Sequence, residues 1–254
     1  MLLTIDVGNT HTVLGLWDGS KLAHDFRIES SKGRTSDEIL VLLLTLMDVA
    51  GVDRRHVHAS IVASVVPALT DPICHAARRA FGHETMQVGP GIKTGMPILY
   101  ENPREVGADR IANAVAAYER CKSAVVVVDF GTGTNFDCVS PKGEFLGGVI
   151  APGMQISAEA LFSRAARLSR IPIAKPPRAI GRNTQHSVQS GIVFGYVGLV
   201  DGLVDRIRDE IEGPCRVLAT GGLARLVAPE SRTIEEVVPD LTLEGLRLLY
   251  ERNQ

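Results

Sequence analysis

The sequence feature that most constrains the fold is a strand that ends in Asp-x-Gly and occurs twice. The chain begins with LLTIDVGNTHTVLGL at residues 2–16, and residues 124–138 read AVVVVDFGTGTNFDC. In each copy, a run of apolar and β-branched residues typical of a strand leads to an aspartate two residues before a glycine. The repeat therefore predicts two related strand–turn–strand units.

The repeat extends beyond the two turns. When Asp6 is aligned with Asp129, Gly8 falls on Gly131, and the turns WDGSKL and SPKGEFL fall within one residue of each other. A second correspondence pairs IVASVVPAL (61–69) with VLATGGLARL (217–226). Chance similarity between short strand–turn units is the alternative, but agreement in element type and order favours gene duplication. We expect two α/β domains that meet at a cleft, with the Asp-x-Gly turns facing one another across it.

Composition limits the classes of partner. A formal net charge of -2 gives no electrostatic reason to expect nucleic acid or an anionic membrane. The four cysteines show no C-x-x-C spacing, as expected for a reduced cytoplasm. Asp6 interrupts the first apolar run, unlike a signal peptide, and the apolar run ILVLLLTLM at 39–47 is far short of the ~20 residues that span a bilayer. We expect a soluble intracellular protein.

The two turns offer a means of binding phosphate. A glycine at a tight turn exposes backbone N–H groups, which can donate to phosphate oxygens together with the hydroxyls of Thr10, Thr12, Thr132 and Thr134. Asp6 and Asp129 would repel phosphate directly, so each is better explained as a ligand of a bridging cation. The alternative is a plain hairpin turn, which is less convincing for two copies. Neither a P-loop nor a complete G-x-G-x-x-G is present, since GPGIKTG and GTGTNF depart from both.

A third cluster lies in YENPREVGADRIANA, where a loop enters a predicted helix. In one interpretation Asp109 is a first-turn acid that interacts with the helix dipole, and Arg110 is a solvated charge. In the other, Asp109 accepts a proton from a substrate hydroxyl while Arg110 and Tyr100 hold the substrate. The residues alone favour the first. LATGGLA at 218–224 suits either close approach of an adenine or ribose, or a simple strand-to-helix turn.

The segment 183–211 predicts a long apolar helix that carries four glycines, at 191, 195, 198 and 202. Each costs a helix about 1 kcal/mol relative to alanine. Such glycines are tolerated where another backbone packs very close, at a subunit interface or in a tight core. We expect a homodimer.

Five ordered motifs over essentially the whole chain resemble the type III pantothenate kinases: DVGNT at the start, GADR at 107–110, DFGT at 129–132, GGVIAPG at 147–153 and TGG at 220–222. That family belongs to the actin/hexokinase/Hsp70-like superfamily. The resemblance implies an α/β fold of two duplicated actin-like (ribonuclease H-like) domains around a nucleotide cleft. We expect domains at 1–116 and 117–254, with the last helix packing back on the first domain.

The resemblance also implies an activity, the ATP-dependent phosphorylation of pantothenate to 4'-phosphopantothenate, the first step of coenzyme A biosynthesis. Asp109 would accept the proton, Asp129 would bind K⁺ or NH₄⁺, and Thr184 would reach the pantothenate of the partner subunit in a homodimer. Pantothenate would otherwise be held by Tyr100, Gly107, Ala108, Asp109 and Arg110. ATP would be bound by Asp6 (near Mg²⁺), Val7, Gly8, Asn9, Thr10, His11, Thr12, Val13 and Thr132.

The chain departs from the family at one place. The family commonly reads DFGTATTFD, whereas Gly133 and Asn135 occur here. The glycine should loosen the turn slightly, and the asparagine keeps a polar group in place of a threonine.

Three other functions are compatible with the turns. Another small-molecule kinase or phosphatase of the superfamily should lack the Tyr100 and GADR constellation. An Hsp70-like ATPase would need a substrate-binding module, for which no chain is left. Against a regulatory or transcriptional accessory protein stands the intact set of Asp6, Asp109, Arg110 and Asp129.

Overall fold

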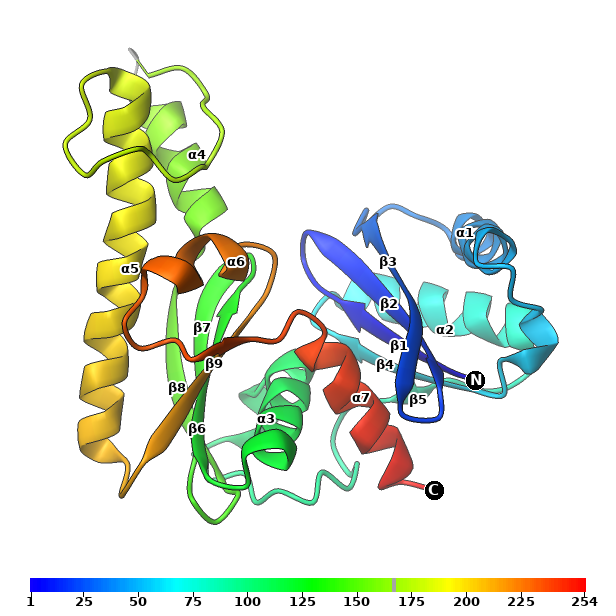
Figure 1. The fold of residues 1–254 in the computed structure, drawn as a ribbon. Helices are drawn as coiled ribbons and strands as arrows, with labels where there is room; N and C mark the ends of the chain where they lie inside the picture. The colour runs from blue at the N-terminus through cyan, green and yellow to red at the C-terminus, as the bar shows by residue number, and fades with distance from the viewer. Residues whose placement is uncertain (166–167) are drawn as a thin grey trace. The chain divides into compact units, whose positions relative to one another are not determined.

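The computed structural model describes residues 1–165 and 168–254, which divide into two units (Figure 1). Unit 1 comprises residues 1–96, 101–116 and 241–254, and unit 2 comprises residues 97–100 and 117–240. A five-stranded mixed sheet with helices lies in each unit. The predicted α/β fold of two duplicated domains is therefore confirmed.

The sheet of unit 1 has the strand order β3-β2-β1-β4-β5. β1 and β2 form the first predicted hairpin, β3 adds to it in antiparallel fashion, and β4 and β5 continue the sheet in parallel. The strand bounds are Leu2–Val7 (β1), His11–Asp18 (β2), Lys21–Glu29 (β3), Ala59–Ser64 (β4) and Met86–Gln87 (β5).

The helices of unit 1 start and end at recognisable signals. Thr35 caps α1 in a capping box with Glu38. Pro67 opens α2, and Gly82 in the left-handed conformation ends it. The core of this unit joins β1, β2, α1 and α2. The helix bounds are Ser36–Val49 (α1), Pro67–Phe81 (α2), Ala108–Cys121 (α3, whose residues from Ala117 belong to unit 2) and Leu241–Glu251 (α7).

The sheet of unit 2 has the order β10-β9-β6-β7-β8. Read from the other edge, as β8-β7-β6-β9-β10, it matches the order β3-β2-β1-β4-β5 of unit 1 strand for strand. The second predicted hairpin is β6 with β7, and β9 is parallel to β6. The strand bounds are Ala124–Phe130 (β6), Gly133–Val139 (β7), Phe145–Pro152 (β8), Cys215–Thr220 (β9) and Glu236–Val237 (β10).

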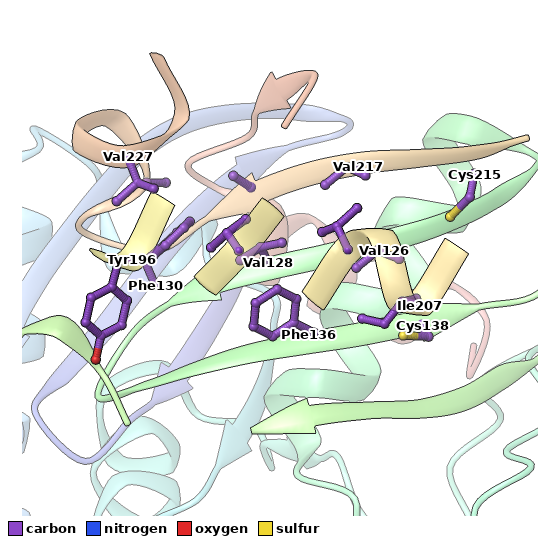
Figure 2. Close-up of a cluster of buried hydrophobic side chains, with 14 of the residues drawn as sticks. Val126, Val128, Phe130, Phe136, Cys138, Tyr196, Ile207, Cys215, Val217 and Val227 are labelled. Atoms are coloured by element: carbon purple, nitrogen blue, oxygen red, sulfur yellow. The ribbon is translucent and has the colours of Figure 1, made fainter. Parts of the chain in front are cut away.

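The core of unit 2 lies between this sheet and the long helix α5, Thr184–Glu210. Figure 2 shows Val126, Val128 and Phe136 of the strands beneath segments of α5. Two short helices, α4 (Met154–Arg164) and α6 (Ala224–Val227), complete the unit. Because one stripe of α5 fills this core, the helix is fixed along one face of the sheet.

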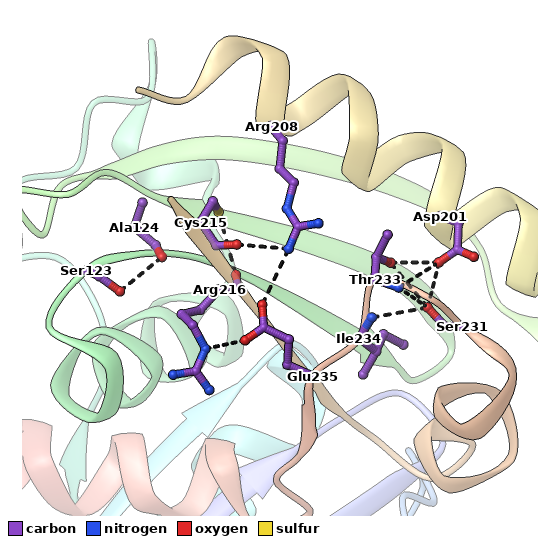
Figure 3. A network of polar contacts seen from close by, with 10 residues as sticks. All are labelled: Ser123, Ala124, Asp201, Arg208, Cys215, Arg216, Ser231, Thr233, Ile234 and Glu235. Carbon is purple, nitrogen blue, oxygen red and sulfur yellow. Dashed lines mark hydrogen bonds and ion pairs between the residues drawn. The ribbon is translucent and has the colours of Figure 1, made fainter. Parts of the chain in front are cut away.

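Polar contacts tie α5 to the segment that follows β9 (Figure 3). The carboxylate of Asp201 accepts hydrogen bonds from the hydroxyls of Ser231 (2.6 Å) and Thr233 (2.7 Å). Arg208 donates to the carbonyl of Cys215 at 3.0 Å. Glu235 pairs with both Arg208 and Arg216. These contacts hold the C-terminal half of α5 against the edge of the sheet.

The opposite face of α5 is open. Within the described residues, one helix, α5, is long and apolar enough to cross a membrane. Its most apolar 18-residue window has a mean hydropathy of 1.4, and 28% of that window is buried. A Cβ at Gly191, Gly195 or Gly198 would meet no atom within 4 Å. These three glycines are therefore not explained by tight packing inside unit 2.

The strand registers show that Asp6 and Asp129 are equivalent. Each aspartate is the penultimate residue of its strand. Each pairs with one residue of the antiparallel strand that completes its hairpin and with one residue of the neighbouring parallel strand. The partners are Val13 and Ala63 for Asp6, and Asn135 and Thr220 for Asp129. The sequence alignment of the two aspartates agrees with this topology.

Candidate functional site

The first turn lies at the end of β1 in unit 1. The amide of Gly8 donates to the carbonyl of His11 at 3.0 Å and closes the turn. Asn9, Thr10 and His11 are exposed, and Asp6 is partly exposed just before them. The turn therefore presents backbone and side-chain donors to solvent beside a carboxylate, as a nucleotide phosphate with its cation requires.

Two of the predicted hydroxyl donors point elsewhere. Thr12 is 3% exposed, and its hydroxyl forms a 2.8 Å hydrogen bond with that of Ser30. Thr134 holds the equivalent place in unit 2 and is 1% exposed, with no hydrogen-bond partner for Oγ1 among the described residues. Strand alternation places both on the face opposite the aspartates. Thr10 and Thr132 are the exposed hydroxyls of the two turns.

The predicted substrate loop enters α3 in unit 1. Asp109 lies in the first turn of this helix, and its Oδ1 accepts a hydrogen bond from the backbone N–H of Arg110 at 2.9 Å. Burial raises the pKa of Asp109 above its ordinary value, although the Arg110 backbone and guanidinium oppose the shift. Arg110 is only 7% exposed, so it is not the solvated charge of the simpler interpretation.

Gly107 and Val65 connect this carboxylate to the first turn. A Cβ at Gly107 would lie 2.5 Å from Oδ1 of Asp109 and 3.6 Å from Cγ1 of Val65. The amide of Val65 in turn donates to the carbonyl of Val7 at 3.0 Å. The end of β1 and the start of α3 are therefore neighbours in unit 1, and glycine at 107 leaves the space that the Asp109 carboxylate occupies.

The second turn, in unit 2, is held by close backbone contacts around Asp129. A Cβ at Gly221, whose φ is +89°, would lie 2.5 Å from Oδ1 of Asp129 and 2.7 Å from the backbone of Phe130. A Cβ at Gly153 would overlap the carbonyl of Thr132. Gly221 thus allows the end of β6 to come close, which is what the simple strand-to-helix turn, one of the two alternatives for LATGGLA, would need. A Cβ at Gly222 would meet nothing within 4 Å, so that glycine is open to solvent.

Tyr100 and Thr184 belong to unit 2. The segment before Tyr100 runs beside β8, with the amide of Leu99 donating to the carbonyl of Phe145 at 2.8 Å. The ring centroid of Tyr100 is 6.4 Å from that of Phe145. Thr184 is exposed in the first turn of α5, which Asn183 caps by accepting from the amide of His186.

The donor sets around the two aspartates suit cations that take few protein ligands. Among residues 1–165 and 168–254, no group of three or more His, Cys, Asp or Glu side chains is arranged to hold a metal ion. A Mg²⁺ bound with ATP takes most of its ligands from phosphate and water, so Asp6 alone fits it. Oδ1 of Asp129 lies close to the backbone of Gly131 and Gly221, and backbone carbonyl oxygens can replace the hydration shell of a monovalent cation. The cysteines of the described residues are free thiols.

The sequence missed several residues of these surroundings. The sequence predicts no functional role for Val65, in the strand–turn unit at 61–69, or for Gly153. The signal for Gly153 was present in GGVIAPG, but its partner across the sheet, Thr132, could not be inferred without the fold. Asn135 was noted only as a departure from a motif, and its place opposite Asp129 depends on the strand register.

Comparison with known proteins agrees with this geometry. A type III pantothenate kinase from Myxococcus xanthus is 57% identical over 253 residues, covering 100% of this chain and 99% of the relative, and one from Pelobacter propionicus is 59% identical with full coverage of both. One solved structure with the same fold is described as a putative Baf family transcriptional activator from Campylobacter jejuni; its sequence identity is 17%, its TM-score is 0.62, and the match covers 99% of this chain and 98% of that one. Another is the ethanolamine utilization protein EutJ from Carboxydothermus hydrogenoformans, with 14% identity, a TM-score of 0.56, and coverage of 97% of this chain and 89% of that one. The family model of the type III pantothenate kinases matches residues 2–206. The chain belongs to the type III pantothenate kinase family.

Proposed function

We propose that this protein phosphorylates the primary hydroxyl of pantothenate with ATP, which gives 4'-phosphopantothenate in the first step of coenzyme A biosynthesis. The observation that carries the proposal is a full-length match to pantothenate kinases, at 57% identity in one case. The part-buried Asp109 at the start of α3 and the two equivalent aspartates at strand ends support it. Each of these carboxylates has a place in phosphoryl transfer.

ATP is bound through the exposed turns. The residues of the first turn, Asp6 to Val13, line the phosphates, with donors from the backbone amides and exposed side chains of the turn, and Thr132 of the second turn adds a hydroxyl. Asp6 is the carboxylate that would hold Mg²⁺, and this ion supplies charge neutralisation on the phosphate oxygens when bound. Because Thr12 is hydrogen-bonded to Ser30, its contribution to ATP comes through the backbone.

Asp109 acts as the general base. The carboxylate takes the proton of the pantothenate hydroxyl, the hydroxyl oxygen forms a bond to the γ-phosphorus, and the bond from that phosphorus to the β,γ-bridging oxygen breaks to release ADP. Burial raises the pKa of Asp109, and a carboxylate with a raised pKa is a stronger proton acceptor than an exposed one. Tyr100, Gly107, Ala108 and Arg110 position pantothenate, and Arg110 is suited to its carboxylate by charge.

Asp129 is the proposed ligand of a monovalent cation, K⁺ or NH₄⁺. The support is its carboxylate beside glycine backbone, without a group of three acidic or imidazole side chains among the described residues. A single carboxylate balances a single positive charge. Such a site favours a monovalent ion over a divalent one, which would need more negative ligands.

The protein is proposed to be a cytoplasmic homodimer with no nucleic-acid or membrane partner. The open glycine face of α5 supports self-association, because three exposed helix glycines have no packing role within unit 2. Thr184, at the start of α5, would then reach pantothenate bound by the other subunit. A formal net charge of -2 supports the lack of a nucleic-acid partner.

The test is ADP release with ATP and Mg²⁺, with and without pantothenate, in matched KCl and NaCl solutions. We expect release that depends on pantothenate and is much faster in K⁺. Release that ignores pantothenate would overturn the substrate and leave an ATPase, and equal rates in K⁺ and Na⁺ would overturn the Asp129 site. Absence of release under every condition would favour the regulatory alternative.

A further inference from the structure

Asn135 lies directly across from Asp129 on neighbouring antiparallel strands. The register pairs Asp129 of β6 with Asn135 of β7. Side chains directly opposite each other in an antiparallel pair share a face, with Cβ atoms about 4.5–5.5 Å apart. Both residues are partly exposed, whereas their neighbours Val128, Thr134 and Phe136 are buried. The amide and the carboxylate therefore emerge together on the solvent-accessible part of this face.

The amide of Asn135 is not committed to the fold. Its side chain takes part in no hydrogen bond within residues 1–165 and 168–254, and it carries both an acceptor oxygen and two donors. Its Oδ1 points along the strand toward the turn, where a Cβ at Gly133 would lie only 3.3 Å away. An acceptor oxygen thus lies beside the second turn, on the strand next to that of Asp129.

Gly133 and Asn135 depend on each other. A Cβ at position 133 would crowd both Oδ1 of Asn135 and, at 3.4 Å, the carbonyl of Ala151 on β8. Glycine leaves room for the longer asparagine side chain to lean toward the turn. The two residues at which this chain departs from DFGTATTFD are therefore spatially coupled.

Unit 1 provides an internal comparison. The residue opposite Asp6 is Val13, which offers no oxygen. The carboxylate next along the face of unit 2, that of Asp137, is 0% exposed and lies two register pairs farther from the turn. The oxygen of Asn135 is therefore a feature of the Asp129 position alone, and it adds a ligand without adding charge.

We propose that Oδ1 of Asn135 is a second side-chain ligand of the monovalent cation at Asp129, and that the Gly133–Asn135 pair sets the preference among monovalent cations. The amide oxygen adds a ligand without adding negative charge, and carbonyl oxygens of this kind can replace the hydration shell of K⁺. This inference rests on the proposed cation site at Asp129.

The experiment measures cation binding without turnover. The unfolding midpoint of the protein is titrated with KCl, NH₄Cl and NaCl at constant ionic strength set by choline chloride, because a ligand that binds only the folded state raises the midpoint in a saturable way. The variants are Asn135→Leu, which removes the oxygen, and Asp129→Asn. Ile150→Ala is the control, because Ile150 pairs with Asn135 from β8 and is 66% exposed but offers no side-chain oxygen.

For the wild type and Ile150→Ala we expect the same saturable response to K⁺. Asn135→Leu should need about 10-fold more K⁺ for half of the response, a loss typical of removing one residue from a metal's surroundings. If Asn135→Leu responds to K⁺ as the wild type does while Asp129→Asn loses the response, the role of Asn135 is overturned and the Asp129 site is not. No K⁺ response in the wild type would overturn the Asp129 site and this inference together.

A double-mutant cycle tests the coupling. Gly133→Ala in the wild type should push the amide aside and weaken K⁺ binding, whereas the same change with Asn135→Thr should have little effect, because the shorter side chain leaves room for the methyl group. Equal effects of Gly133→Ala in both backgrounds would contradict the coupling. If Asn135→Leu folds poorly, Asn135→Ala removes the same oxygen with a smaller side chain.

Discussion

At the scale of single residues, the raised pKa of Asp109 has consequences for both rate and stability. Burial is the main cause of the shift, and the hydrogen bond from the Arg110 backbone does not cancel it. A carboxyl group whose folded pKa is raised holds its proton more tightly in the folded state than in the unfolded state. Its favourable contribution is present below the unfolded pKa and is lost as the pH rises through the folded pKa.

We therefore predict opposite changes for Asp109→Asn. Its kcat should fall by about 10²–10⁴, the usual contribution of a positioned base. Its free energy of unfolding at neutral pH should exceed that of the wild type, because no buried carboxylate is ionised, and the difference should shrink as the pH falls toward about 4. Denaturant unfolding at several pH values, with kcat on the same samples, checks both. A variant that is less stable at neutral pH would contradict the assigned burial cost.

Much of this residue-scale description could be predicted from the sequence, but not the direction of individual side chains. Asp6 and Asp129 were paired correctly because each ends an apolar strand before a glycine. Thr12 was expected to donate to phosphate, yet alternation places its side chain on the opposite face, against Ser30. The proximity of Asn135 to Asp129 needs the register of β6 and β7, which short apolar strands do not specify in advance.

At the scale of elements, α5 carries glycines that packing within its own unit does not explain. Its buried stripe fills the core of unit 2, and Asp201 and Arg208 fix it to the β9 side. The glycines of its open face lower helix stability, and a Cβ at Gly191, Gly195 or Gly198 would meet no atom within 4 Å in the described part of unit 2. A second copy of the helix against this face would supply packing there, as small residues allow two backbones to come close.

We predict that Gly195→Arg converts a dimer to a monomer. Arginine is a better helix former than glycine by about 1 kcal/mol, so the helix itself should be more stable and loss of the dimer would not reflect unfolding. Val41→Arg on α1, where the side chain is 62% exposed, is the control and should remain dimeric. Light scattering after size-exclusion chromatography gives the masses. A monomeric wild type, or a dimeric Gly195→Arg variant, would contradict the proposed interface.

At the scale of the whole molecule, the proposed function gives two copies of one topology different chemistry. The sheets share their strand order, and the aspartates occupy equivalent places. The residue across from the aspartate differs, being Val13 in unit 1 and Asn135 in unit 2. This difference agrees with the proposed roles of the two units. Unit 1 would carry the general base and the Mg²⁺ bound with ATP, and unit 2 would carry the monovalent cation.

The duplication and fold class were accessible from the sequence, because strand–turn patterns repeat in order. The place of residues 97–100 in unit 2, inside the range 1–116 expected for the first domain, was harder to foresee. Within unit 1, α7 packs so close to α3 that a Cβ at Gly245 would overlap the backbone of Ala112. Contacts of this kind depend on the tertiary arrangement and leave no periodic signal in the chain.

The most direct test of the central claim is detection of the product itself. The protein is incubated with ATP, Mg²⁺, K⁺ and pantothenate, and the mixture is analysed by mass spectrometry beside an Asp109→Asn sample. The proposed function predicts a species with the mass of pantothenate plus one phosphoryl group, formed in step with ADP and strongly reduced in the variant. ADP without that species, or equal product from both proteins, would contradict the assigned reaction or the assigned base.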